Sequence, residues 1–268
     1  MRQLIVANQQ ISKKYTPTHI QNMIKAQIDN SLDLAWQPED IILMTNFEYE
    51  YRGVKARNKQ LNEHCLTGSK MFAIHELLRN GEIGQNEIIW SHDLDAWQNV
   101  PFDTAESSME FADIGICKYS NERLNGGSIF YKSTAADIVA KVVQTITEGQ
   151  EQKEEPTINK IFKMKEYRGR ITILNSTYNV GCSGFVKRYN RAIKPVRVSH
   201  FHPLNRIAWD THVQDRNKLG VISTAPRLIA LLQKWFPDAH GPEPRPGPVP
   251  VSEPWPKPEP GPEPEPKI

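Results

Sequence analysis

Cysteine is scarce in this sequence of 268 residues. Its three cysteines, Cys65, Cys117 and Cys182, are odd in number and far apart, and no Cys-x-x-Cys pair occurs. The pattern does not suggest a disulfide framework, and it excludes a zinc ribbon or a redox dithiol, which need closely spaced thiols. The sequence therefore indicates a protein of a reducing compartment, and we expect it in the cytoplasm.

Long apolar runs and two familiar catalytic motifs are also missing. The apolar run at residues 4–7 is too short for the core of a signal peptide or for a membrane span, so no transmembrane segment is predicted. Residues 75–78, His-Glu-Leu-Leu, lack the second histidine of a zinc protease. Residues 67–70, Thr-Gly-Ser-Lys, lack the upstream glycine of a phosphate-binding P-loop. These absences exclude both enzyme classes.

A strong charge of either sign is absent as well. The formal net charge is +2, and residues 1–240 contain 30 basic and 26 acidic residues. This balance tolerates an anionic ligand such as a nucleotide diphosphate, but it is not that of a domain that binds nucleic-acid backbones. The overall charge therefore favours a glycan over a nucleic acid as the macromolecular partner.

Proline is concentrated at one end of the chain. Of the 20 prolines, 12 lie between Pro242 and Pro266, where they alternate with Glu, Lys, Val or Trp. Such a composition favours an extended polyproline II conformation and cannot bury a core. We therefore predict one domain over residues 1–240 and a Pro-rich tail or linker over residues 241–268. This segment would connect to a further domain or bind a partner.

The apolar residues of the first 240 positions alternate between strand and helix patterns. Short apolar runs followed by helical stripes predict βαβ units, and hence an α/β fold with a mainly parallel sheet flanked by helices, as in Rossmann-like proteins. Strands are predicted at 4–7, 41–45, 87–90, 114–116, 127–131, 171–174 and 196–198. Helices are predicted at 18–36, from Thr67 or Ser69 to Asn80-Gly81, and at 135–147, 156–164 and 226–236.

Two aspartates directly follow one of these strands. Asp93 and Asp95 come after the apolar run 87–90, between Trp90 and Trp97. Ligands of open α/β sheets bind beyond the carboxyl ends of the strands. The Asp-x-Asp tripeptide alone also fits a solvated turn, but carboxylates in a partly desolvated site are stabilised by a cation. The position therefore predicts a Mn²⁺ or Mg²⁺ ion that carries a diphosphate.

A second cluster, His200 and His202, follows a late strand. Strand alternation predicts that both imidazoles lie on one face, where His200 can complete the metal shell of Asp93 and Asp95. The alternative is that one or both histidines form hydrogen bonds in the core or face solvent.

Four segments in order resemble the GT-A glycosyltransferases, most closely family 8 and related galactosyltransferase-like enzymes. They are residues 67–74 (Thr-Gly-Ser-Lys-Met-Phe-Ala-Ile), 90–96 with the Asp-x-Asp, 124–131 (Leu-Asn-Gly-Gly-Ser-Ile-Phe-Tyr) and 154–159 (Glu-Glu-Pro-Thr-Ile-Asn). His200-Phe201 is similar to the opening of the family's C-terminal metal motif, although Pro-Leu-Asn-Arg at 203–206 replaces its Gly and Lys-Pro-Trp. The resemblance covers residues 1–210 and implies a GT-A fold, a divalent cation and a nucleotide-diphosphate sugar, such as a UDP-sugar, as donor.

The resemblance also implies roles for residues of the first and third of these segments. Lys70 would contact the diphosphate or the sugar, and Asn125, Gly126 and Gly127 would line the sugar pocket. The residues themselves predict a turn at 125–127, where the backbone approaches the sugar and Asn125 binds its hydroxyls. An ordinary hairpin turn is the alternative.

Further candidates lie at the ends of predicted elements. Glu154 and Glu155 begin a helix, where one of them could act as a general base or orient the acceptor hydroxyl, or where both are simply helix-start charges. Ala7 and Asn8 follow the first strand and Asn46 follows the second, which are the positions where this fold holds the base and the ribose.

The sequence thus predicts a glycosyltransferase that moves a sugar from a nucleotide-diphosphate sugar to a hydroxyl acceptor. A sugar-phosphate nucleotidyltransferase is the first alternative, but Asn8-Gln9-Gln10 is not the Gly-rich loop that such enzymes carry after their first strand. The second is a non-catalytic GT-A-like binding module whose Pro-rich tail recruits proteins with aromatic grooves.

Overall fold

The chain is described by a computed structural model over residues 1–9, 16–58, 69–102, 108–120, 123–149, 153–214, 219–220 and 222–237. The Pro-rich segment 241–268 lies outside these ranges, as does the predicted domain boundary at residue 240. Within the described ranges, no helix is both long enough and apolar enough to cross a lipid bilayer.

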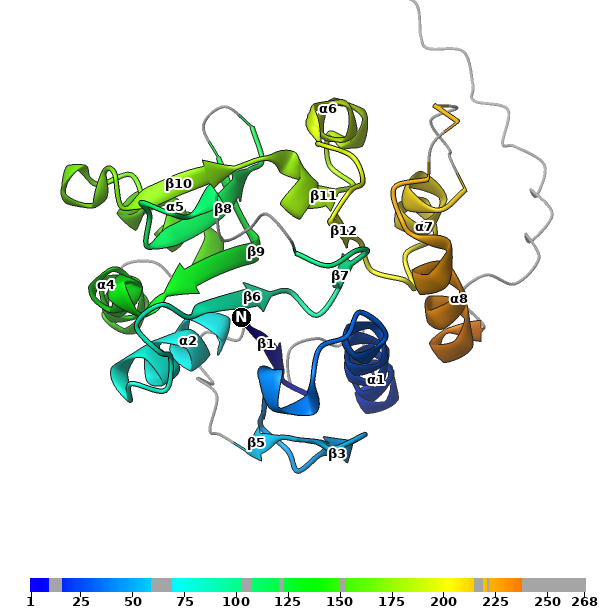
Figure 1. Ribbon diagram of the computed structural model, residues 1–268, viewed down its shortest axis with the longest axis horizontal. Coiled ribbons are helices and arrows are strands. Elements are labelled where there is room, and N and C mark those ends of the chain that lie inside the picture. Colours follow the sequence, from blue (N-terminus) through cyan, green and yellow to red (C-terminus); the bar gives the residue numbers. More distant parts are fainter. Residues whose placement is uncertain are drawn as a thin grey trace, which may run out of the picture.

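A seven-stranded sheet forms the centre of the molecule, and β9 is its antiparallel member. The parallel pairs are β1 with β2 and β6, β2 with β5, and β8 with β10, whereas β9 runs antiparallel between β6 and β8. This confirms the predicted mixed, mainly parallel sheet. In spatial order (Figure 1), the strands are β10 (Ile171–Leu174), β8 (Ile114–Lys118), β9 (Leu124–Lys132), β6 (Ile88–His92), β1 (Arg2–Ala7), β2 (Ile41–Thr45) and β5 (Arg57–Asn58).

Helices cover both faces of this sheet because side chains alternate along each strand. In β1, Leu4 and Val6 belong to one hydrophobic cluster, whereas Ile5 and Ala7 belong to another. The first cluster includes side chains of α2 (Ser69–Arg79), α4 (Ala136–Thr147) and α5 (Glu154–Ile161), and the second includes side chains of α1 (Pro17–Asp33). Figure 1 accordingly shows α2 and α4 on one side of β1 and α1 on the other.

A smaller sheet extends the second face. Its order is β11 (Val180–Gly181), β12 (Val198–His200) and β7 (Ala96–Gln98), and β12 runs antiparallel to β7 with His200 opposite Ala96. The helix α6 (Phe185–Arg191) packs on β11, while α7 (Arg206–His212) and α8 (Pro226–Trp235) pack around Trp97. The antiparallel pairing therefore brings the end of β12 to the turn between β6 and β7.

Short elements complete the fold. The strands β3 (Glu50–Tyr51) and β4 (Val54–Lys55) form a hairpin whose turn residues, Arg52 and Gly53, have φ values of 48° and 80°. Two successive positive φ values are typical of the tight turns that suit the twist of a hairpin. The 3₁₀ helices are η1 (Pro38–Asp40), η3 (Ser133–Ala135), η4 (Lys165–Tyr167) and η5 (Ser176–Tyr178).

Most of the longer predicted elements are present within a few residues of their expected bounds. The helix α1 starts as expected because Pro17 occupies its first turn and the Thr16 hydroxyl accepts a hydrogen bond from the His19 amide. The predicted strand 196–198 is instead β12 at 198–200, and the helix predicted at 156–164 is α5 at 154–161. The strand β7 and the helices α6 and α7 were not predicted, because three to seven residues are too few for a periodic pattern.

The turn predicted at 125–127 is wrong. Asn125, Gly126 and Gly127 lie within β9, which begins at Leu124. The register on β8 shifts there, because Ile116 pairs with Ile129 while the next residue, Cys117, pairs with Asn125. Gly126 and Gly127 are therefore part of a bulge, a strand irregularity in which glycines serve where another group approaches the backbone closely.

Burial of the α1 apolar face should provide a large share of the stability. Ile24 of α1 is fully buried, whereas Ile207 of α7 is 65% exposed. We expect Ile24→Ala to lower the free energy of unfolding by about 2–5 kcal/mol, because it removes buried methyl groups and leaves a cavity. The matched control Ile207→Ala should change it by less than about 0.5 kcal/mol. Urea denaturation of both variants measures the difference, and equal losses would contradict the assigned packing.

Candidate functional site

The turn between β6 and β7 carries the two aspartates. β6 ends at His92, and the turn is closed by a 2.9 Å hydrogen bond from the Ala96 amide to the Asp93 carbonyl. The Asp93 amide donates to the carbonyl of Gly127 at 2.9 Å, which fixes the turn on the β9 bulge. The predicted position of Asp93 and Asp95 beyond the end of a strand is therefore confirmed, and the turn joins the central sheet to the small one.

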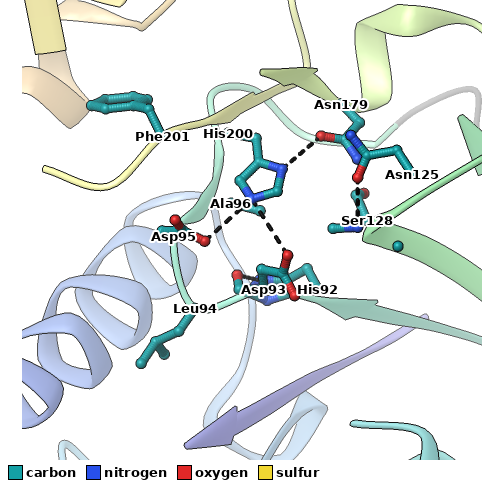
Figure 2. Close-up of polar contacts among 12 residues, drawn as sticks. His92, Asp93, Leu94, Asp95, Ala96, Asn125, Ser128, Asn179, His200 and Phe201 are labelled. Carbon is teal, nitrogen blue, oxygen red and sulfur yellow. Dashed lines mark hydrogen bonds and ion pairs between the residues drawn. The ribbon is translucent and has the colours of Figure 1, made fainter. Parts of the chain in front are cut away.

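His200 comes from β12 and faces both aspartates. Its Nε2 lies 3.2 Å from Asp95 Oδ1 and 3.4 Å from Asp93 Oδ2. One ligand atom from each of the three residues can be chosen so that all lie within 4.8 Å of one another. Figure 2 shows the imidazole between the two carboxylates and Asn179. Two carboxylate oxygens and one imidazole nitrogen are a donor set that suits Mn²⁺ or Mg²⁺, so the predicted group fits a divalent cation.

Two neighbours fix the orientation of the His200 ring. Asn179 Oδ1 lies 3.0 Å from His200 Nδ1 (Figure 2). Because an amide oxygen can only accept, Nδ1 carries the proton and, in the neutral ring, Nε2 presents its lone pair to the carboxylates. On the other side, a methyl group at Gly127 would lie 2.1 Å from His200 Cε1. The missing side chain at Gly127 therefore provides the space that the imidazole occupies.

The pKa values of His200 and Asp95 shift in opposite directions. Burial alone would lower the pKa of His200, but the carboxylates of Asp95 and Asp93 outweigh burial and raise it above its ordinary value. Burial alone would raise the pKa of Asp95, but the imidazole of His200 outweighs burial and lowers it to about 2. A divalent cation at this position would compete with a proton for the Nε2 lone pair of His200.

His92 supports the turn from behind. Its ring stacks on Trp90 with 3.9 Å between the ring centroids. Gln3 Nε2 lies 2.8 Å from His92 Nε2, and His92 Nδ1 lies 2.8 Å from the Asp93 carbonyl, an arrangement that suits the neutral ring protonated at Nδ1. Burial lowers the pKa of His92 to about 4, so the ring stays neutral near pH 7. His92 therefore holds the backbone of the turn without adding charge to the site.

Lys70 and Glu154 form a second charged pair beside the aspartates. Lys70 Nζ donates hydrogen bonds to the Asp93 carboxylate and, at 2.8 Å, to the Gly126 carbonyl. The same atom lies 3.3 Å from Glu154 Oε1. Burial alone would lower the pKa of Lys70, but the carboxylates of Asp93 and Glu154 outweigh burial and raise it. Burial raises the pKa of Glu154 to about 7 despite the nearby ammonium. Glu154 can therefore exchange a proton near neutral pH.

The remaining predicted residues surround the same cavity, with one exception. The cavity has a volume of about 710 Å³. Asn46 is not among its lining residues, and its side chain accepts a hydrogen bond from the Gln9 amide at 3.0 Å. The predicted residues that line the cavity are Ala7, Asn8, Lys70, Asp93, Asp95, Asn125, Gly126, Gly127, Glu154, Glu155 and His200.

His202 and Glu155 occupy the margins of the site. β12 ends at His200, so the expected strand alternation does not continue to His202, which lines the cavity outside the group of three possible ligands. Glu155 forms an ion pair with Arg123 at 3.2 Å. Of the two glutamates, Glu154 is thus the one that contacts Lys70.

Several functional candidates were missed by the sequence analysis. His19, Tyr119, Arg123 and Lys153 line the cavity, and Asn179 orients His200. Lys153 directly precedes Glu154 and Glu155, so its position next to these candidates could have identified it. The sequence around Asn179 contained no such signal, because its contact with His200, 21 positions later, depends on the fold alone.

The fold is that of known glycosyltransferases. The described structure matches the glycosyltransferase GlyE from Streptococcus pneumoniae TIGR4 with a TM-score of 0.55 at 12% identity, covering 88% of this chain and 64% of that one. It matches an active-site mutant of the galactosyltransferase LgtC with a TM-score of 0.50 at 13% identity, covering 87% of this chain and 96% of that one. No protein-family model and no curated protein matches the sequence. The structural likeness confirms the GT-A-like fold.

Adding a side chain at Gly127 should disrupt cation binding. In Gly127→Ala the new methyl group overlaps His200, so we expect Mn²⁺ to bind at least about tenfold more weakly, as titration followed by electron paramagnetic resonance can measure. Gly126→Ala is the matched control, because its methyl group would come no closer than 3.5 Å to Glu154 Oε1. Equal Mn²⁺ affinities for the two variants would contradict the placement of His200.

The raised pKa of Glu154 should appear in the pH dependence of stability. The folded pKa of about 7 lies above the ordinary 4.5, so the folded protein binds more protons between these values and its stability falls as pH rises through that window. In the absence of metal, the unfolding free energy of the wild type minus that of Glu154→Gln should fall by up to about 3 kcal/mol from pH 4.5 to 7. A difference that stays constant over this range would show that Glu154 ionises normally.

Proposed function

We propose that this protein is a metal-dependent glycosyltransferase that moves a sugar from a nucleotide-diphosphate sugar to a hydroxyl acceptor. The observation that carries the proposal is the convergence of Asp93, Asp95 and His200 with Lys70 and Glu154 on one cavity. A cation site next to the half-buried ammonium group of Lys70 suits a diphosphate, and a cavity of about 710 Å³ is in the range of small-molecule sites.

In this proposal, Asp93, Asp95 and His200 hold the divalent cation. When bound, the cation acts as a Lewis acid that offsets the negative charge of the departing diphosphate. Asn179 keeps the His200 lone pair directed at the cation site, and the carbonyl of Asp93 is fixed by His92. These contacts place the ligands before the donor arrives, so little reorganisation is needed on binding.

Lys70 acts on the diphosphate of the donor, and Glu154 acts on the hydroxyl group of the acceptor. Lys70 already lies between Asp93 and Glu154, where its ammonium group can bind a phosphate oxygen. During transfer, the acceptor oxygen bonds to the anomeric carbon while the bond from that carbon to the diphosphate breaks. Glu154, with a pKa of about 7, accepts the hydroxyl proton, because it is ionised in part of the population at neutral pH. Asn125 lines the cavity and binds sugar hydroxyls.

The proposed nucleoside contacts lie at the ends of the first two strands. Ala7 and Asn8 line the cavity at the end of β1 and are the proposed contacts of the nucleoside. Asn46 contributes indirectly, since it holds the Gln9 amide of the loop that follows β1. The domain is proposed to span residues 1–240, with residues 241–268 as a linker or docking segment.

Removing either aspartate should abolish the reaction. We expect Asp93→Ala and Asp95→Ala to lower the Mn²⁺-dependent hydrolysis of a sugar nucleotide by at least about 100-fold, because each removes a cation ligand. A panel of sugar nucleotides, monitored by release of the nucleoside diphosphate, identifies the donor. Asp33→Ala is the control, since Asp33 is an exposed residue at the end of α1.

Circular dichroism of the three variants checks that the fold is retained. Undiminished hydrolysis in the Asp93 and Asp95 variants would reject the site, and wild-type protein that hydrolyses no donor in the panel would favour a non-catalytic binding module.

A further inference from the structure

The basic residues of the chain are concentrated in one segment. Residues 153–197 contain 11 lysines and arginines against three acidic residues, whereas the rest of residues 1–240 contains 19 basic and 23 acidic residues. This segment runs from α5 through β10 and α6 to the start of β12, next to the cavity. The mild overall charge therefore conceals a strongly basic segment of the chain.

A second hollow is lined mostly by this segment. We call it the β10 groove, a depression of about 540 Å³ lined among others by Lys118, Lys163, Arg168, Met164, Tyr167 and Ile173. Lys118, Lys163 and Arg168 are exposed, and Ile173 is 46% exposed. None of the described residues that line the groove is acidic. The groove thus combines an apolar floor with a basic rim.

A stripe of lysines connects the cavity to the β10 groove. Lys153 lines the cavity at the start of α5, Lys160 lies in the last turn of α5, and Lys163 lines the groove. All three are exposed. Lys153 directly precedes α5 and Lys163 lies two residues beyond its end, so the three lysines follow the length of this eight-residue helix from the cavity to the groove. A ligand with several negative charges in a row can therefore contact the cavity and the groove at the same time.

We propose that the acceptor is a single-stranded nucleic acid that lies along the lysine stripe, with its phosphates on the lysines and its bases in the β10 groove. Grooves that bind single strands combine basic side chains with surfaces on which bases stack. The floor formed by Met164, Tyr167 and Ile173 suits base faces, whereas the hydroxyls of a glycan would lose their hydrogen bonds to water there. A flat bilayer would contact only the rim of this concave surface.

This assignment of the acceptor rests on the proposed function. A hydroxyl group of the strand, placed in the cavity, would bond to the anomeric carbon, its proton would pass to Glu154, and the nucleoside diphosphate would leave. Binding of the strand can be tested without this reaction, so the failure of one does not imply the failure of the other.

The test measures binding of a fluorescent 12-nucleotide DNA strand of mixed sequence by anisotropy, without donor or metal. We expect Lys160→Glu/Lys163→Glu to weaken binding at least tenfold at 0.1 M salt. The slope of log affinity against log salt, about −0.7 for each phosphate contacted, should become less steep by roughly 1–2. The control Lys55→Glu/Arg79→Glu makes the same charge change at exposed residues outside both hollows and should bind like wild type.

Three outcomes would overturn the proposal. They are no measurable binding of the strand by wild type, equal weakening in the control variant, and tighter binding to heparin or to vesicles with anionic lipids than to the strand. Donor hydrolysis is measured in parallel. Lys160→Glu/Lys163→Glu should hydrolyse donor at the wild-type rate, because neither lysine touches the cation group or Lys70.

Discussion

Repulsion among carboxylates is the constraint on which this site depends. Asp93, Asp95 and Glu154 all line one partly desolvated cavity, where like charges strongly raise each other's free energy. The Lys70 ammonium lies between Asp93 and Glu154, and the His200 imidazole lies beside both aspartates. A divalent cation bound by His200 and the two aspartates would further offset this repulsion.

The central sheet and the aspartates could be predicted because their signals are local. Continuous apolar runs identified β1, β2, β6, β8 and β10, and the position of Asp93 and Asp95 after such a run placed them at a sheet edge. The GT-A-like fold was expected from the family resemblance of residues 67–74, 90–96, 124–131 and 154–159. The hydrogen bond that Asn46 accepts from the Gln9 amide could not be predicted in this way, because it joins residues 37 positions apart.

The geometry around His200 could not be predicted from the sequence. It requires β12 to pair with β7, Asn179 to reach from the segment before β11, and the bulge of β9 to leave space at Gly127. Each segment is short, and each contact joins residues distant in sequence. The turn expected at 125–127 failed because Asn-Gly-Gly has the composition of a turn, while the strand pairing on both sides makes it a bulge.

The cation site lies at the junction between the two sheets. Asp93 and Asp95 stand between β6 of the large sheet and β7 of the small one, and His200 ends β12 of the small sheet. An ion held by all three residues is therefore a crosslink, and its binding free energy adds cohesion between two sheets that are also joined by chain connections and side-chain packing. The small sheet, with α7 and α8 packed around Trp97, would then open to solvent more often in the ion-free protein than in the loaded one.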